Sequence, residues 1–276
     1  ELPRNSFPLG VLRLMEQAGS DTRAMSGIVR RAASNLDWID KARGQSLYLV
    51  GGSWRALGQT HLRDTDYPLP MLHGYQQSRQ ELLPWLEKLR KADDEALDKL
   101  PIRKKRRRSA MPAAAAALIG LIEASEAETV VFSAYGIRQA MMVEHVLSPN
   151  IWRNPQRLMQ QAVLSMDHNG NRYDEDLRAA MRYFLPSDLT HNSGLSATAV
   201  ELILELADVG WDYHPERRSQ DVVFDVLHTQ DLPLTHQDRV AVAIALNTRQ
   251  GGDYDKEIKE DVLDLLPKSS LKAALA

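Results

Sequence analysis

The stretch SLYLVGGSWRALGQTHL, residues 46–62, decides the fold. Its first five residues form a continuous apolar run, which predicts a strand buried on both faces, as in a parallel sheet. Gly51 and Gly52 stop that strand, and Ser53 is an acceptable N-cap for a helix that continues to about Leu62. This arrangement presents free N–H groups and the positive end of the helix dipole to a ligand, for which phosphate is the natural occupant. A plain strand-to-helix turn is the simpler explanation of the two glycines taken alone.

Strand and helix patterns alternate through the first half of the chain. Residues 6–14 (SFPLGVLRL) are apolar and interrupted by Pro8 and Gly10, which predicts a strand with a bend or bulge. Residues 129–134 (TVVFSA) predict a further, fully apolar strand. Helical periodicity marks residues 20–44, 53–62, 78–91, 112–124 and 135–146. The alanine-rich helix at 112–124 is apolar nearly all round, so we expect it to be buried in an α/β layer with three strands.

Beyond Pro149 the strand patterns disappear. Every periodic segment there is helical, with Pro, Gly, Asn and Asp between the segments, which cover residues 153–166, 175–184, 196–208, 219–229, 237–246 and 256–266. A length of 276 residues suits two domains. We therefore expect an α/β domain at residues 1–148 and an all-helical domain at residues 149–276.

The composition excludes several classes of protein. The absence of cysteine excludes disulfides, zinc–thiolate sites, iron–sulfur clusters and a cysteine nucleophile, and is compatible with the cytoplasm. No run of about 18 apolar residues exists, which excludes a membrane-spanning helix. The N-terminal sequence ELPRN is no signal peptide and lacks an initiator Met, so we expect a processed or excised piece of a longer polypeptide.

Charge is distributed unevenly along the chain. Residues 1–150 carry 21 basic and 17 acidic side chains, against 13 and 20 in residues 151–276, so the first segment is the one that would attract a polyanion. Six of its positive charges are consecutive, in RKKRRR at residues 103–108. Arginine forks could grip a chain of phosphates there, although a solvated loop or a nucleic-acid patch explains the run equally well. No aromatic residue interrupts the run to stack bases, which weakens the nucleic-acid alternative.

Catalytic motifs are not found, and the histidines give only a weak indication of a metal site. His191, His214, His228 and His236 lie in the helical half, together with Asp208. Helical metal-dependent phosphohydrolases use an adjacent His-Asp pair, but here Ala207 precedes Asp208, which favours structural or surface histidines. The chain has no P-loop, no G-x-S-x-G and no H-E-x-x-H sequence, and no local pair of carboxylates suited to general acid and base catalysis. We assign no metal ligand and no catalytic residue.

Five sequence blocks in a fixed order carry a resemblance to a known family. They are residues 6–14, the segment SLYLVGGSWRALGQTHLRDTDYPLPMLHGY at 46–75, RRRSAMPAAAAAL at 106–118, TVVFSAYGIRQAMM at 129–142, and the helical pair ADVGWDYHPERR at 207–218 and HQDRVAVAIALNTRQGG at 236–252. Together they resemble the exopolyphosphatase and guanosine pentaphosphate phosphohydrolase (Ppx/GppA) family of the actin-like superfamily. The blocks cover most of the chain, and their order is far more specific than the Gly-Gly loop alone.

This resemblance implies a fold and a set of roles. It implies the second, incomplete lobe of an actin-like, ribonuclease H-like fold, followed by a helical, degenerate HD-like domain. Gly51, Gly52 and Ser53 would line the phosphate cleft, and Arg106, Arg107 and Arg108 would face the same cleft. Tyr135-Gly136 would match the motif that packs between the two lobes. The implied reaction is release of the terminal phosphate of polyphosphate or guanosine pentaphosphate, with Mg²⁺ and a catalytic glutamate activating water.

The sequence also departs from the family pattern. The first lobe, with its D-x-G-S-N phosphate loop and catalytic glutamate, and the D-x-G-G-G-S strand pair of the second lobe are not present. We therefore expect a fragment that starts at the third strand of the second lobe, whose strand at residues 47–50 has an open edge and whose isolated form is inactive. The missing lobe and a second copy of the chain are the expected partners. The alternative is a module that binds polyphosphate, (p)ppGpp or a nucleotide without cleaving it.

Overall fold

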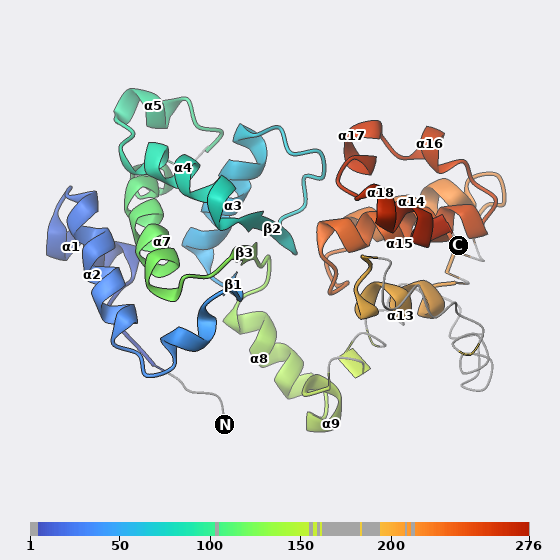
Figure 1. The fold of residues 1–276 in the computed structure, drawn as a ribbon, viewed down its shortest axis with the longest axis horizontal. Coiled ribbons are helices and arrows are strands. Elements are labelled where there is room, and N and C mark those ends of the chain that lie inside the picture. The colour runs from blue at the N-terminus through green and yellow to red at the C-terminus, as the bar shows by residue number, and fades with distance from the viewer. Residues whose placement is uncertain are drawn as a thin grey trace. The chain divides into compact units, whose positions relative to one another are not determined.

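The computed structural model describes residues 5–102, 105–154, 157, 158, 161, 183, 194–207, 209, 210 and 213–275. The chain divides into two compact units, Glu1–Arg138 and Gln139–Ala276 (Figure 1). The boundary between the units falls inside helix α8 (Ile137–Val146). The expected domain boundary after residue 148 stays a prediction.

A small mixed sheet is the centre of the first unit. Its strands are β1 (Ser46–Leu49), β2 (Tyr75–Ser78) and β3 (Thr129–Phe132), in the order β1-β3-β2. β1 is parallel to β3 with Leu49 opposite Phe132, and β2 is antiparallel to β3 with Tyr75 opposite the same Phe132. Leu49, Tyr75 and Phe132 are buried in one apolar cluster with side chains of four helices, so one face of the sheet carries the core.

Helix α7 (Met111–Ser125) lies in that core, between α2 (Thr22–Ser34) and α4 (Arg79–Arg90) (Figure 1). Its run of alanines is fully buried, as the sequence predicted. Small side chains let the helices approach closely: a Cβ on Gly120 would lie 2.5 Å from the Ser26 carbonyl oxygen of α2. This contact fixes α2 against α7 at short distance.

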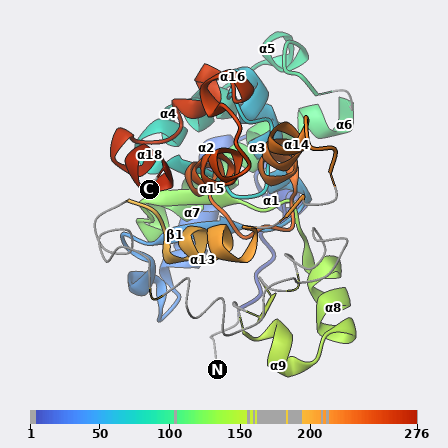
Figure 2. The same ribbon diagram turned by 90° about the vertical axis from the view of Figure 1, so that its right-hand side faces the viewer.

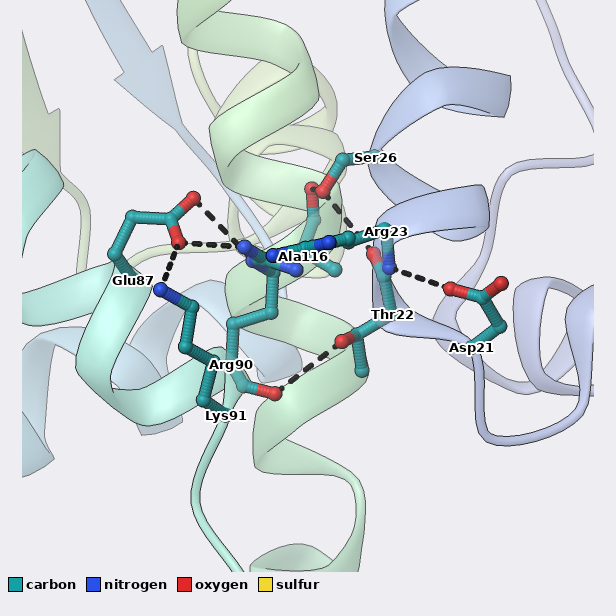
Figure 3. A network of polar contacts seen from close by, with 8 residues as sticks. All are labelled: Asp21, Thr22, Arg23, Ser26, Glu87, Arg90, Lys91 and Ala116. Atoms are coloured by element: carbon teal, nitrogen blue, oxygen red, sulfur yellow. Dashed lines mark hydrogen bonds and ion pairs between the residues drawn. The ribbon is translucent and has the colours of Figure 1, made fainter.

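Polar contacts link α2, α4 and α7 at one place (Figure 3). The Ser26 hydroxyl donates to the Ala116 carbonyl of α7 at 2.9 Å, and the Thr22 hydroxyl donates to the Arg90 carbonyl at the end of α4 at 3.3 Å. Arg90 also holds Glu87 through two nitrogens, and this hydrogen bonding lowers the pKa of the Glu87 carboxyl. The network joins helices whose positions the apolar core already sets.

Two expectations for the sheet are wrong. Residues 6–14 form no strand: residues 5–10 have no regular structure and α1 (Val11–Ala18) is a helix, because Leu14 at helical spacing from Val11 and Ala18 packs on Met25 and Val29 of α2. The β1 strand is not buried on both faces, since Tyr48 is 68% exposed. The third strand is instead β2, whose polar sequence YQQS gives no apolar pattern.

The predicted helices of the first unit are otherwise confirmed. α3 (Gly52–Asp64), α4 and α7 match the patterns at 53–62, 78–91 and 112–124, and the Ser78 hydroxyl caps α4 by accepting from the Glu81 N–H. The pattern at 20–44 is divided between α2 and the 3₁₀ helix η1 (Ile39–Ala42). Two short helices, α5 (Asp94–Asp98) and α6 (Lys105–Ser109), precede α7.

The described part of the second unit contains helices and no strand (Figures 1 and 2). α15 (His236–Arg249) is buried along most of its length. It packs against α13 (Ala197–Glu205), α14 (Arg218–His228) and α18 (Lys268–Leu275). Arg239 on α15 is fully buried and donates to the carbonyls of Val226, Thr229 and Leu232. Most of the predicted helices at 153–166 and 175–184 lies outside the described residues. The other helices in the described part of this unit are α9 (Pro149–Trp152), α16 (Tyr254–Glu257) and α17 (Glu260–Leu263).

Candidate functional site: an uncapped helix pair at the edge of the sheet

The predicted glycine loop lies between β1 and α3. Gly51 has φ +142°, a conformation that side chains rarely adopt, and it is the N-cap of α3. The helix therefore begins at Gly52, one residue before the expected position, and Ser53 lies in its first turn. Gly51 has no side chain to accept from the first N–H groups, and no side chain caps this end. The first turn of α3 thus presents its N–H groups and the positive end of its dipole outward.

A pocket of about 330 Å³ adjoins this first turn. Ser53 lines it from α3, and the other lining residues come from the first turn of α1 and the segment before it: Phe7, Pro8, Gly10, Val11, Leu12 and Arg13. The N-cap of α1 is Gly10, so α1 also begins without a side-chain cap. None of the lining residues is acidic, and Arg13 is an exposed cation. Two uncapped first turns and one guanidinium therefore border the same pocket, which favours an anion.

The turn after β3 lies at the same edge of the sheet. Because β1 and β3 are parallel, their carboxyl ends meet, and the Ser133 N–H donates to the Leu49 carbonyl at 3.1 Å. Arg55 in the first turns of α3 donates from Nη1 to the Ala134 carbonyl at 3.0 Å, and the ring of Tyr135 contacts that of His73 with centroids 4.9 Å apart. Ligands of open α/β sheets bind outside the carboxyl ends of the strands.

The basic run is attached near the other end of α3. Arg63 in the last turn of α3 donates to the Pro101 carbonyl at 3.1 Å. Arg108 forms an ion pair with Asp98 and donates to the Ile102 carbonyl at 2.9 Å. Arg63 is ten residues beyond Ser53, so the two ends are roughly 15 Å apart along the helix axis. A ligand that contacts both the glycine loop and this segment must therefore be extended.

The predicted arginines differ in their surroundings. Arg107 is exposed, whereas Arg108 is bound by Asp98 and the Ile102 carbonyl. The side chain of Arg106 lies outside the described residues, as do Arg103 and Lys104. A role of these arginines in phosphate binding stays a prediction.

Comparison with known proteins identifies the family. The sequence profile of the Ppx/GppA phosphatase family matches residues 4–149. The chain belongs to the Ppx/GppA phosphatase family. Its structure is similar to a crystal structure of the type II variant of the Aquifex aeolicus Ppx/GppA phosphatase, with 16% sequence identity and a TM-score of 0.43. The similarity covers 53% of this chain and 51% of that one, and no curated protein sequence matches this chain.

In this Ppx/GppA chain, sequence reasoning missed the contribution of α1. The pocket residues from Phe7 to Arg13 were assigned to a strand, whose side chains would have been placed in the sheet. One sequence feature could have identified them: Gly10 directly precedes VLRLMEQA, in which Val11, Leu14, Met15 and Ala18 follow helical spacing. Arg55 was also missed, because nothing in the sequence places it beside Ala134.

The described residues give no ligand set for a metal ion. No three His, Asp or Glu side chains lie together anywhere in the described part of the chain. Of the candidate histidines, His228 contacts the Phe224 carbonyl through Nδ1 at 2.8 Å and His236 is buried at the start of α15, while His191 and Asp208 lie outside the described residues. Magnesium stays an expectation of the family resemblance, with no ligand assigned to this chain. Nor do the described helices include one that could cross a membrane.

Proposed function

We propose that this chain forms part of the phosphate-binding cleft of a phosphohydrolase that releases the terminal phosphate of inorganic polyphosphate or guanosine pentaphosphate. Membership of the Ppx/GppA phosphatase family supports the reaction class. The observation that carries the assignment to a site is the pocket bordered by the uncapped first turns of α1 and α3, with Arg13 and Ser53 and no acidic residue. Phosphate oxygens accept hydrogen bonds from such N–H groups and are attracted by both dipoles.

The chain's own residues would bind and orient the phosphates. The N–H groups of Gly52 and Ser53 and the Ser53 hydroxyl would donate to one phosphate, and the Arg13 guanidinium would neutralise its charge. The second part of an extended substrate would follow α3 toward Arg107. We propose that this cleft half belongs to an actin-like lobe, and that the carboxylate that activates water is supplied by a first lobe. Magnesium belongs to the proposal only through the family resemblance.

Phosphate release from long-chain polyphosphate tests this division of roles. We expect the purified chain to bind polyphosphate in a salt-sensitive manner and to release no phosphate when magnesium is added. Substitution of Ser53 by Asp should abolish most of the binding, whereas Ser196→Asp, at the N-cap of α13 in the second unit, is the matched control. Turnover by the purified chain would contradict the proposed division, and unchanged binding by Ser53→Asp would contradict the proposed site.

A non-catalytic binding module is the second candidate. It is favoured by one specific observation: the pocket contains Arg13 and Ser53 but no carboxylate that could act as a general base. The two candidate functions can be distinguished by measuring phosphate release after a first lobe from another Ppx/GppA phosphatase is added as a separate chain. Restored phosphate release favours the hydrolase part, and binding without release favours the module. Competition between polyphosphate and (p)ppGpp in the same assay distinguishes the two substrates. For both candidate functions we propose that the chain forms a homodimer.

A further inference from the structure

The acidic helix α5 (Asp94–Asp98) packs against α6 (Lys105–Ser109), which belongs to the basic run. Asp98, the last residue of α5, forms an ion pair with Arg108 of α6. In the described part of the chain, no other carboxylate of α5 pairs with an arginine of the basic run. One arginine of a run that we expect to bind phosphate is therefore held by a carboxylate of the chain itself.

The apolar core holds both members of this ion pair in place. Leu97, directly before Asp98, is buried in the core cluster of the first unit, and so is Met111, three residues after Arg108. Arg108 also donates from Nη2 to the Ile102 carbonyl at 2.9 Å. Because the two side chains are kept at close range, Asp98 competes for Arg108 at a high effective concentration.

The ion pair leaves the guanidinium of Arg108 incompletely satisfied. Only Nη1 contacts Asp98, whereas a guanidinium can donate to a carboxylate or a phosphate through two nitrogens at once. Nε of Arg108 is buried and has no hydrogen-bond partner among the described residues. The side chain of Asp98 is 71% exposed and that of Arg108 only 21%, so Asp98 can turn into water while Arg108 keeps its place. The contact can therefore open without unfolding either helix.

We propose that Asp98 is an autoinhibitory residue, which competes with polyphosphate for Arg108 and releases it only to an extended chain. The ligand itself rests on the proposed function. A chain whose first phosphates are bound beside Ser53 and which extends along α3 brings later phosphates to α6 at a high local concentration. A ligand that fills only the pocket does not reach Arg108, because the two ends of α3 are roughly 15 Å apart. Asp98 thus makes occupation of the basic run depend on ligand length.

Calorimetric titration with long-chain polyphosphate tests this competition. Asp98→Asn keeps the size of the side chain and removes its charge, so it should raise the affinity roughly two- to fivefold, the range that exposed ion pairs contribute. Asp94→Asn is the matched control, because it removes the same charge from an exposed residue of α5 that forms no ion pair among the described residues. At physiological salt it should change the affinity less than about 1.5-fold. Neither variant should change the affinity for tripolyphosphate.

A double variant separates direct competition from a general effect of charge. Combined with Arg108→Gln, Asp98→Asn should no longer raise the affinity, because the cation for which it competes is gone. Urea denaturation confirms that each variant folds, and the comparison with Asp94→Asn stands without the double variant.

The outcomes for Asp98 and for the phosphate pocket can be told apart. Equal affinities of Asp98→Asn and Asp94→Asn for long-chain polyphosphate, or a gain that persists beside Arg108→Gln, would overturn the competition while the pocket stands. If Ser53→Asp left binding unchanged and Asp98→Asn still strengthened it, the pocket would fail and the competition at Arg108 would hold. No binding of polyphosphate by the unmodified chain or by Asp98→Asn would overturn both.

Discussion

The two ends of α3 differ in the groups that they offer to an anion. At its N-terminal end, Gly51 leaves the first turn uncapped beside a pocket with Arg13 and no carboxylate. At its C-terminal end, Arg63 contacts the segment that leads into the basic run, where Arg108 is already paired with Asp98. A high density of positive charge in a sequence therefore does not by itself leave every cation free for a ligand, since Arg108 is already paired. We expect the oriented N–H groups at the N-terminal end, which have no side-chain acceptor, to bind the first phosphate more strongly than the basic run does.

A substitution that disrupts the packing of α3 on the sheet should have the largest effect on the free energy of unfolding. A Cβ on Gly58 would lie 2.6 Å from Leu72 Cδ1 and 2.7 Å from Phe132 Cδ1, so Gly58→Val should lower the free energy of unfolding by about 3 kcal/mol. Both ends of α3 would then lose their positions. Gly52→Ala, which meets no atom within 4 Å, is the control and should change stability by less than about 1 kcal/mol. Urea denaturation measures both, and equal stability of the two variants would refute close packing at Gly58.

A negative charge at the N-terminal end of α3 should separate binding from folding. Ser53→Asp places a carboxylate in the first turn, where it favours the helix by roughly 0.3–1 kcal/mol but repels phosphate. We expect the affinity for tripolyphosphate to fall at least about tenfold while the free energy of unfolding stays equal or rises. Calorimetric titration gives the affinity. Weaker binding accompanied by lower stability would instead indicate a damaged fold.

The two cations should respond differently to ligand length. Arg13→Ala should weaken tripolyphosphate and long-chain polyphosphate alike, by about fivefold, because Arg13 lies at the pocket. Arg107→Ala should weaken only the long chain, since roughly 15 Å separates the two ends of α3. The same titration at two salt concentrations checks both variants. If Arg107→Ala weakened tripolyphosphate as much as Arg13→Ala, the two ends would not be independent.

Acid should lower the free energy of unfolding through His61, a buried residue of α3. The His61 ring accepts or donates a 2.6 Å hydrogen bond with the Tyr75 hydroxyl, and burial lowers the pKa of His61, although Asp64 and Glu81 oppose the shift. The unfolded chain therefore takes up the proton more readily. Stability from His61 is complete above pH about 6.5 and decreases as the pH falls below it, by at most about 1.4 kcal/mol per pH unit. His61→Gln should flatten this dependence in urea titrations, whereas substitution of the exposed His145 by Gln should leave it unchanged.

The sequence predicted the parts of the site that depend on neighbouring residues. The strand, the Gly51 turn and α3 follow from one continuous stretch, and the buried α7 follows from its own composition. The rest depends on distant contacts. α1 is a helix because Leu14 packs on Met25 and Val29, and the pocket joins Arg13 to Ser53, forty residues away in the chain.

The sheet also depends on contacts between residues distant in the sequence. β2 consists of the polar residues YQQS and forms because β3 offers it a free edge, which no local pattern records. β1 was expected to be covered on both faces, yet Tyr48 is exposed because the core helices pack on the face that carries Leu49. The partner of Arg108 was equally hidden, since Asp98 lies in a different short helix.

An NMR titration of the amide groups with tripolyphosphate tests the central claim most directly. If the uncapped first turns bind phosphate, the N–H signals of Gly52 and Ser53 on α3 and of Leu12 and Arg13 on α1 should shift together and saturate at one ligand concentration. Shifts confined to residues 105–109, with those four signals unchanged, would contradict the account.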